Sequence, residues 1–434
     1  MDYRQAEQYL LSLSNLPRKE YMDDTEKCDD YLKRLQFFLD ILENPEKDIP
    51  HYIHVTGTSG KGSTVNYLHS ILYEGGKAVG STISPHPSKL TERWRIGDTV
   101  MADEEFVEIM NELRPKLDEY LRTSPYDMLS YFDLTTTIAI YWMAKKHVEW
   151  AVLEVGCGGR YDSTNVIPDK DVAVITNIGL DHTDILGDTK EKIAYEKAGI
   201  ITRDCSVFTM EEDESVLDVI QKEADKNNVT LSRIMHQGTD IVQTLDKISF
   251  TYNDRQYSLS CLGEHQIKNA SLVIEIAQSL GISEESIKAG LHNAKQPLRM
   301  EIVSKKPLII LDGAHNPDKM RTSAQTLKKI IKSKNNQISL IIGFSENKDI
   351  EKMVTILSEL KPANIACTRY TNNVFRKVAH PKDIAKKFKE HLPEADIEMY
   401  LSPADAFQKL KKRLTKHDIL LCTGSIFLSG ELHP

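Results

Sequence analysis

The chain has 434 residues, more than the roughly 250–300 residues that one hydrophobic core usually serves, so two domains are expected. Its 40% hydrophobic and 27% charged residues are typical of a soluble globular protein. The net charge of −9, without a basic block interleaved with aromatic residues, argues against a nucleic-acid partner.

Neither a membrane span nor a secretion signal is predicted. No apolar run approaches the roughly 18 residues that a span needs, and the N-terminus lacks a basic head followed by an apolar stretch. The six cysteines are scattered, with no C-x-x-C pair or zinc spacing, which indicates reduced thiols. We therefore expect a cytoplasmic protein with no membrane partner.

The first functional signal is the segment "HVTGTSGKGST" at 54–64. An apolar, β-branched run at 51–56 predicts a strand before it, and apolar residues at helical spacing predict a helix over 63–76 after it. Glycines that let backbone N–H groups converge, a helix N-terminus, Lys61 and the hydroxyl of Ser63 are what a nucleotide phosphate needs. The segment therefore predicts a phosphate-binding loop.

The spacing of this segment differs from the common phosphate loop, G-x-x-x-x-G-K-[ST]. Five residues before Gly60 stands Val55 rather than glycine, and Gly62 rather than a hydroxyl residue follows Lys61. An ordinary glycine turn is the alternative reading, but it does not account for the lysine and the hydroxyls together.

Farther along, strand-like runs alternate with helical stretches, which is the rhythm of a doubly wound, mostly parallel sheet. The predicted strands of this first region are 77–84, 149–156, 171–179 and 205–210. Two alternating runs around Asn253 and Asp254, within 246–266, predict a small antiparallel hairpin. A second α/β rhythm follows, with strands predicted at 307–313, 338–344, 364–370, 396–401 and 418–424.

These elements predict a P-loop-type α/β domain at 1–296. A smaller, Rossmann-like α/β domain is predicted at 297–434. The boundary is placed next to Gln296 and Pro297, where the second rhythm begins.

Polar residues follow several predicted strands, at the end where ligands bind in open α/β sheets. They are Ser84, His86, Glu92, Arg93 and Arg95 after the second strand, Glu154, then Asp181, His182, Asp184 and Lys197, and in the second region Asp312, His315 and Asn316. A carboxylate at a strand end is often a cap or salt-bridge partner. Beside a phosphate loop, Glu154 is placed to hold magnesium, which prefers oxygen ligands.

Seven stretches, taken in order, resemble the Mur ligase superfamily, and within it the folylpolyglutamate synthase and dihydrofolate synthase family. They are "HVTGTSGKGS", "SPH…TER", "LEVGCGGRYDSTNVI", "DHTDILGDT…IAYEKAGI", "GEHQIKNA", "ILDGAHNP" and "TGSIFLSGE". The family's loop reads "HVAGTNGKGS", so the unusual spacing belongs to this family. The resemblance covers nearly the whole chain.

The resemblance implies an ATP-dependent ligase that joins L-glutamate to a pteroate or folate carboxylate through an acyl phosphate. The implied catalytic residues are Lys61, Glu154, His182 and Lys197. The implied nucleotide-binding residues are Gly57, Thr58, Ser59, Gly60, Lys61, Gly62, Ser63, Thr64, Asn269, Arg299, Asp312 and His315. The implied magnesium ligands are Ser63, Ser84, Glu154, His182 and Lys197, the last of which the family carbamylates. The implied substrate residues are Phe132, Tyr161, Asp162, Ser163 and Ser425, and the N-terminal helices of the 1–296 domain are implied to bind substrate.

Four departures from the family pattern concern the substrate rather than ATP. Ser59 replaces asparagine, Pro87 replaces leucine, "PLR" at 297–299 replaces "PGR", and Asp133 replaces glutamate after Phe132. A ligase of the same superfamily that acts on a different carboxylate is therefore an alternative. A nucleotide-dependent switch is a second alternative, although it leaves Glu154, His182 and Lys197 unexplained. The expected partners are small molecules, and a monomer is expected.

Overall fold

The computed structural model describes residues 1–13, 28–167, 169–235, 238–331, 336–373 and 376–433. The chain divides into two compact units that interleave along the sequence. The first comprises Met1–His86, Leu90–Gln237 and Lys268–Ala294, and the second comprises Pro87–Lys89, Gly238–Ile267 and Lys295–Pro434. The functional assignment of domains 1–296 and 297–434 stays a prediction.

An eight-stranded sheet forms the centre of the first unit, in the order β4-β3-β2-β5-β1-β6-β7-β8. The strands are β1 (His51–Thr56), β2 (Val79–Thr82), β3 (Trp94–Ile96), β4 (Thr99–Val100), β5 (Trp150–Glu154), β6 (Val172–Ile175), β7 (Ser206–Thr209) and β8 (Leu231–Arg233). The six strands from β2 to β8 run parallel, and β3 and β4 run antiparallel at one edge. Because β1, β2, β5 and β6 are neighbours and parallel, the loops that follow them open at the same edge of the sheet.

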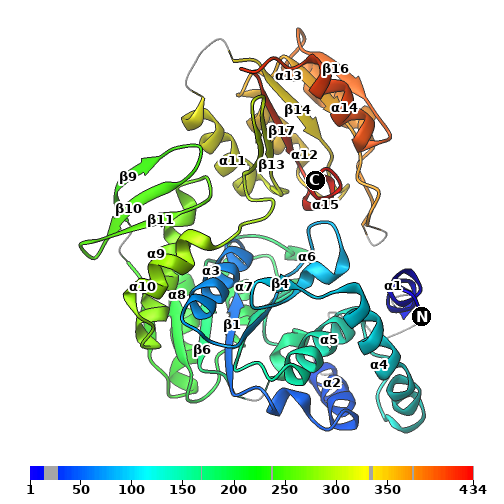
Figure 1. The fold of residues 1–434 in the computed structure, drawn as a ribbon, viewed down its shortest axis with the longest axis vertical. Helices are drawn as coiled ribbons and strands as arrows, with labels where there is room; N and C mark the ends of the chain where they lie inside the picture. Colours follow the sequence, from blue (N-terminus) through cyan, green and yellow to red (C-terminus); the bar gives the residue numbers. More distant parts are fainter. Residues whose placement is uncertain (14–27, 168, 236–237, 332–335, 374–375, 434) are drawn as a thin grey trace. The chain divides into compact units, whose positions relative to one another are not determined.

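Helices pack on this sheet (Figure 1). They are α1 (Tyr3–Ser12), α2 (Asp29–Ile41), α3 (Lys61–Glu74), α4 (Asp103–Thr123), α5 (Tyr131–Lys145), α6 (Thr183–Leu186), α7 (Lys190–Ala198), α8 (Glu214–Lys226), α9 (His265–Ser279) and α10 (Glu284–Asn293), with short 3-10 turns η3 (Pro45–Lys47), η4 (Leu90–Arg93) and η5 (Ser163–Val166). Helices α3 and α10 lie against each other, and a Cβ on Gly290 would stand only 2.4 Å from the Ile71 Cα. Glycine at this position therefore permits the close approach of the two helices.

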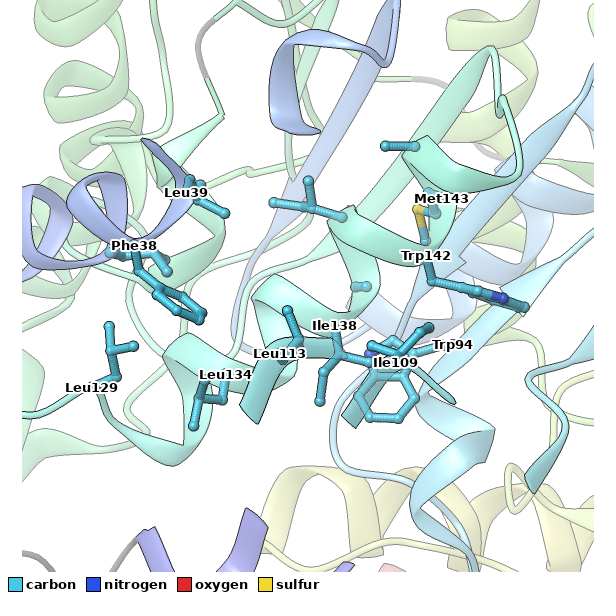
Figure 2. Close-up of a cluster of buried hydrophobic side chains, with 14 of the residues drawn as sticks. Phe38, Leu39, Trp94, Ile109, Leu113, Leu129, Leu134, Ile138, Trp142 and Met143 are labelled. Atoms are coloured by element: carbon cyan, nitrogen blue, oxygen red, sulfur yellow. The ribbon is translucent and has the colours of Figure 1, made fainter. Parts of the chain in front are cut away.

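The largest apolar cluster of the first unit lies between α1, α2, α4, α5 and the sheet. Figure 2 shows Ile109 and Leu113 of α4 and Ile138 of α5 within this cluster, together with Trp94. These four side chains are at most 2% exposed. The burial of α4 and α5 against the sheet fixes the start of α5, where the predicted substrate residue Phe132 lies.

A buried ion pair ties α2 to the start of α5. The Arg34 guanidinium donates to Asp133 Oδ2 at 2.5 Å and to Asp127 Oδ1 at 3.2 Å. The Asp133 carboxylate also accepts from the backbone N–H of Ser130 at 2.7 Å, so the helix start is capped while the charge of Arg34 is balanced.

The second unit contains a six-stranded sheet and a three-stranded antiparallel sheet. The six strands, in the order β12-β13-β17-β14-β15-β16, are β12 (Glu301–Lys305), β13 (Leu308–Leu311), β17 (Ile419–Thr423), β14 (Ile338–Ile342), β15 (Asn364–Cys367) and β16 (Asp396–Met399). The helices are α11 (Pro317–Ile330), α12 (Ile350–Ser358), α13 (Pro381–His391), α14 (Pro403–Arg413) and α15 (Ile426–Glu431). The small sheet, in the order β11-β10-β9, consists of β9 (Thr239–Gln243), β10 (Ile248–Tyr252) and β11 (Arg255–Leu259).

The predicted fold class is confirmed: a mostly parallel α/β sheet, a small antiparallel element and a second α/β sheet are all present. The predicted hairpin is β10–β11, and Asn253 and Asp254 in its turn have φ values of 46° and 58°. The unpredicted strands are β3, β4, β8, β9 and β12. Most of these are very short or lie at a sheet edge, where one face meets solvent and the apolar signal is weak. Among the described residues, no helix is both long and apolar enough to cross a membrane.

The core packing makes a prediction about stability that two leucines of α4 test. Leu113 is fully buried, whereas Leu121 on the same helix is 61% exposed. Leu113→Ala should lower the free energy of unfolding by about 2–5 kcal/mol, because it removes buried methyl groups and leaves a cavity. Leu121→Ala should change it by less than about 0.5 kcal/mol.

Denaturant unfolding followed by tryptophan fluorescence measures this difference in the first unit, because Trp94, Trp142 and Trp150 are the three tryptophans of the chain. Equal losses of stability in the two variants would show that α4 is not packed as described.

Candidate active site

The loop between β1 and α3 adopts a conformation that depends on glycine. Gly57 and Gly60 have φ values of 147° and 86°, in the region that L side chains rarely adopt, and Gly60 is the residue before α3. A Cβ on Gly60 would stand 2.6 Å from Asn269 Oδ1 of α9. The glycines therefore let the loop turn into the helix N-terminus and bring Asn269 against it.

The segment that follows β6 holds this loop in place. The N–H of Thr58 donates to the Asn177 carbonyl at 2.8 Å, and the N–H of Ser59 donates to Asn177 Oδ1 at 2.9 Å. The Thr176 hydroxyl donates to the Ser59 carbonyl at 2.6 Å. Thr176 and Asn177 were not among the predicted site residues, although a polar pair directly after a buried strand was a signal for them.

Glu154 ends β5 and lies beside the loop. A Cβ on Gly62 would stand 3.3 Å from Glu154 Oε2, and the same oxygen accepts from the backbone N–H of Ser84 at 3.0 Å. Only 7% of Glu154 is exposed, and Ser63 is 4% exposed. The structure thus brings Gly62, Ser63, Ser84 and Glu154, which come from three strand ends, to one place.

Two lysines donate to the same carbonyl oxygen. Lys61 Nζ lies 2.9 Å from the Gly57 carbonyl oxygen, and Lys197 Nζ, at the end of α7, lies 3.1 Å from it. Lys197 is 4% exposed. Burial, with a smaller contribution from the Lys61 charge, lowers the pKa of Lys197 to about 7. A large fraction of this amine is therefore neutral at physiological pH.

His182 lies just before α6 with φ of 52° and ψ of 41°. Its backbone N–H donates to Asp181 Oδ1 at 3.1 Å. His182 is half-buried. It lies in the segment that follows β6, the strand next to β1.

The predicted substrate residues Phe132, Tyr161, Asp162 and Ser163 gather around η5 and the start of α5. The Ser163 hydroxyl lies 3.3 Å from the Phe132 carbonyl oxygen, to which it donates. The Phe132 side chain is 53% exposed, which is unusual for a phenylalanine next to a large core. Asp162 Oδ2 accepts from the N–H of Cys157 at 2.9 Å.

In the second unit, the Asp312 carboxylate is buried and accepts several hydrogen bonds. Its donors include the N–H of Met300 at 3.2 Å, the N–H of Ala314 at 3.3 Å and the Ser323 hydroxyl at 2.6 Å. Burial raises the pKa of Asp312. These bonds tie the turn that carries Arg299 to the turn that follows β13.

Arg299 and His315 lie on those two turns. A Cβ on Gly313 would stand 2.8 Å from Arg299 Nη1. His315 Nδ1 lies 2.8 Å from the Gly313 carbonyl oxygen, which can only accept, so Nδ1 carries a proton. Lys319 Nζ lies 3.2 Å from the other ring nitrogen.

Two predicted residues use their side chains inside the protein. Ser425 is 3% exposed, and its hydroxyl accepts from the N–H of Phe427 as the N-cap of α15. Thr64 is fully buried and its hydroxyl has no hydrogen-bond partner among the described residues, so it faces the interior rather than the loop.

The donor set of the first unit suits a magnesium ion that shares its ligands with phosphate. No group of three or more His, Cys, Asp or Glu side chains in the described ranges is arranged to hold a metal. Around Glu154 the protein offers one carboxylate and the serine residues 63 and 84. Magnesium in nucleotide sites usually takes one or two carboxylates and completes its shell with phosphate oxygens and water. The residues therefore fit this ion only together with a nucleotide.

A separate cavity of about 740 Å³ lies on the outer side of α7, next to α8. Its lysines Lys192 and Lys226 pair with Asp188 and Glu223. None of the predicted site residues lines this cavity, so the site described above does not extend into it. The charged side chains of the cavity largely balance one another.

Two domain families match consecutive parts of the chain. Residues 117–277 match the Mur ligase middle domain, and residues 298–426 match the Mur ligase glutamate ligase domain. The dihydrofolate synthase/folylpolyglutamate synthase of Bacillus subtilis is 31% identical over 417 residues, which cover 92% of this chain and 94% of that protein.

Solved structures agree with this match. The folylpolyglutamate synthase of Mycobacterium tuberculosis, complexed with ADP and AMPPCP, superposes with a TM-score of 0.83 at 26% identity, over 92% of this chain and 94% of that one. The Escherichia coli FolC protein in complex with DHPP and ADP superposes with a TM-score of 0.79 at 27% identity, over 98% and 96% of the two chains. The chain therefore belongs to the Mur ligase superfamily and, within it, to the dihydrofolate synthase/folylpolyglutamate synthase family of ATP-dependent ligases.

Proposed function

We propose that this protein joins L-glutamate to the carboxylate of a pteroate or folate, as a dihydrofolate synthase, a folylpolyglutamate synthase or both. The γ-phosphate of ATP passes to a carboxylate oxygen, and ADP leaves. The glutamate amine then attacks the acyl carbon, phosphate leaves, and the amine loses a proton. The observation that carries the proposal is the meeting of Lys61, Lys197, Ser84 and Glu154 around one glycine loop.

The loop supplies positive potential where negative charge develops. Its residues Gly57 to Gly60 precede α3, and Lys61 to Thr64 form the first turn of that helix, where backbone N–H groups are available to an anion. Lys61 adds a point charge at the β- and γ-phosphates, and Asn269 and the second-unit residues Arg299, Asp312 and His315 contribute to nucleotide binding. Preorganised donors of this kind lower the barrier because they need not reorient as charge moves to the transferred phosphoryl group.

Magnesium is the proposed metal, held by Ser63, Ser84, Glu154, His182 and a carbamylated Lys197. When bound, it neutralises charge on the phosphate oxygens. An ammonium at Lys197 would repel a cation, whereas a carbamate formed by its neutral amine with CO₂ is an anionic oxygen ligand. The half-neutral amine at the loop supports this modification.

The pterin part of the pteroate or folate substrate is proposed to lie near Phe132, Tyr161, Asp162 and Ser163. The exposed ring of Phe132 offers an apolar face to an aromatic pterin. Ser425 is still proposed as a substrate residue. Its hydroxyl caps α15, so the proposed contact is made by the N-terminus of that helix. We further propose that the functional domains are 1–296 and 297–434 and that the protein is a monomer. A cytoplasmic location is also proposed, and the six free cysteines support it.

A Mur-type ligase for another carboxylate is the second candidate, because Asp133 replaces the family's glutamate next to Phe132. In this protein the Asp133 carboxylate accepts a hydrogen bond from Arg34. The shorter side chain therefore forms a buried ion pair within the fold at this position. A nucleotide-dependent switch stays the least supported candidate, since it gives no role to Phe132 or Lys197.

Incubation with ATP, L-glutamate and either dihydropteroate or tetrahydrofolate tests the proposal. Mass spectrometry should detect the glutamate adduct of one or both acceptors, and phosphate release should require acceptor and glutamate together. Phosphate release that ignores both substrates would favour the switch, and strict dependence on a different acid would favour the second candidate.

Lys61→Ala provides the matched negative control for this assay. The variant should fold normally and lose about 10²- to 10³-fold in turnover, because one electrostatic contact to developing charge is removed. Lys77→Ala, which removes an exposed lysine beyond the end of α3, should keep full activity. Near-full turnover by Lys61→Ala would show that this loop is not the ATP site.

Lys197 gives a second prediction. Lys197→Ala should lose most activity, and acetate should restore part of it by supplying an oxygen ligand in the vacated space. In the unmodified protein, activity at limiting CO₂ should rise as pH rises through about 7, because the neutral amine is the reactive form.

Lys192→Ala is the control for this prediction, because Lys192 lies on the same helix but is exposed and paired with Asp188. It should be fully active and insensitive to acetate. Full activity of Lys197→Ala without acetate would contradict the proposed ligand role.

A further inference from the structure

His54 is a fully buried imidazole in the middle of the first sheet. Its register partners in β5 and β6 are Leu153 and Ala173, which belong to two separate apolar clusters. The side chain therefore lies at the seam between these clusters. A polar ring at such a place costs stability unless its nitrogen atoms are hydrogen-bonded.

Both ring nitrogens of His54 have partners. Nε2 lies 2.7 Å from Thr164 Oγ1, and Nδ1 lies 3.4 Å from the Nζ of Lys170. The Thr164 hydroxyl lies 2.5 Å from Asp162 Oδ1. A continuous chain of hydrogen bonds thus runs from a buried lysine to a carboxylate in the proposed substrate segment.

The direction of each bond follows from the groups involved. The Asp162 carboxylate can only accept, so the Thr164 hydroxyl donates its single proton to it. The same hydroxyl must then accept from His54, which places a proton on Nε2. Burial lowers the pKa of His54 well below its usual value, so the ring is neutral and Nδ1 accepts from Lys170.

Lys170 has a second branch that reaches the other side of the segment. Its Nζ donates to Asn165 Oδ1 at 2.8 Å. The Asn165 side-chain amide donates to the carbonyls of Arg160 and Gly199, at 3.0 Å and 3.2 Å. Lys170 is 3% exposed, so the amine at which the two branches meet is shielded from water. The two branches fix the chain on both sides of Tyr161–Ser163.

We propose that His54 and Thr164 are positioning residues for Asp162, and that Lys170 anchors them. This chain of hydrogen bonds holds the Asp162 carboxylate in one orientation toward the pteroate or folate substrate. The inference rests on the proposed function, because it assumes that Tyr161–Ser163 contacts that substrate. Neither His54, Thr164 nor Lys170 touches the substrate itself in this account.

Thr164→Val tests the proposal, because it removes the hydroxyl with little change of shape and keeps the backbone N–H bond to Asp162 Oδ1, which is 3.0 Å long. The KM for the pteroate or folate substrate should rise about tenfold, the loss expected for one hydrogen bond to a charged group. The KM for ATP should stay unchanged, although β1 leads directly into the ATP loop. Thr164→Ser should behave as the unaltered protein.

Two controls separate positioning from stability. Thr137→Val removes another buried threonine hydroxyl, which donates to the Asp133 carbonyl within α5, and should change neither KM. His54→Leu and His54→Gln form a second pair, in which glutamine retains an N–H for Thr164 and should recover the low KM. An unchanged substrate KM in Thr164→Val, or an equal rise in both KM values, would overturn the proposal.

A measurement without turnover keeps this test independent of the proposed function. In protein with ¹⁵N-labelled imidazoles, His54 is identified among the 14 histidines by the signal that His54→Gln lacks. Near neutral pH its Nε2 should be protonated and its Nδ1 should be bare. The opposite tautomer would overturn the inference, whereas absence of ligation with the expected tautomer would refute the proposed function and leave the geometry of the chain intact.

Discussion

The site depends on one carbonyl group to which two lysines donate. Gly57 presents its carbonyl to Lys61 and Lys197 from a backbone at positive φ, where a Cβ would stand 1.8 Å from Thr176 Oγ1. Burial lowers the pKa of Lys197, and the nearby Lys61 charge lowers it further, so this buried amine gives up its proton more readily. The loop thus contacts, and contributes to the lowered pKa of, a residue that is 140 positions away in the sequence.

The same parallel sheet delivers every other component of the first-unit site. β1 lies between β5 and β6, so Glu154, the loop and the segment from Thr176 to His182 emerge side by side. Beneath them, on the face of β1 that carries His54, a polar chain reaches Asp162. In the proposed function, the nucleotide loop follows the end of the central strand β1, and the residues proposed to position the substrate segment start from the interior of the same strand.

Sequence patterns predicted much of this, and the reasons for the misses are physical. The strand at 51–56 was predicted with the bounds that β1 has, because its side chains are almost all buried and give a strong apolar signal. The edge strand β12 has only partly buried side chains, and those of β9 are mostly exposed. Neither strand therefore gives a clear apolar pattern in the sequence. The interleaving of Gly238–Ile267 with the second unit comes from long-range packing, which no local pattern encodes. The proposed role of His54 could not be predicted, because a single histidine in an apolar strand does not reveal its partners Thr164 and Lys170.

The central claim is that the buried amine of Lys197 becomes a carbamate and completes the magnesium site. ¹³C NMR of the protein equilibrated with ¹³C-labelled bicarbonate, magnesium and AMPPCP measures this modification directly. A protein-bound carbamate carbonyl signal should appear, strengthen as pH rises through about 7, and be absent in Lys197→Ala but present in Lys192→Ala. A spectrum without that signal at any pH, from protein that binds AMPPCP normally, would contradict the account.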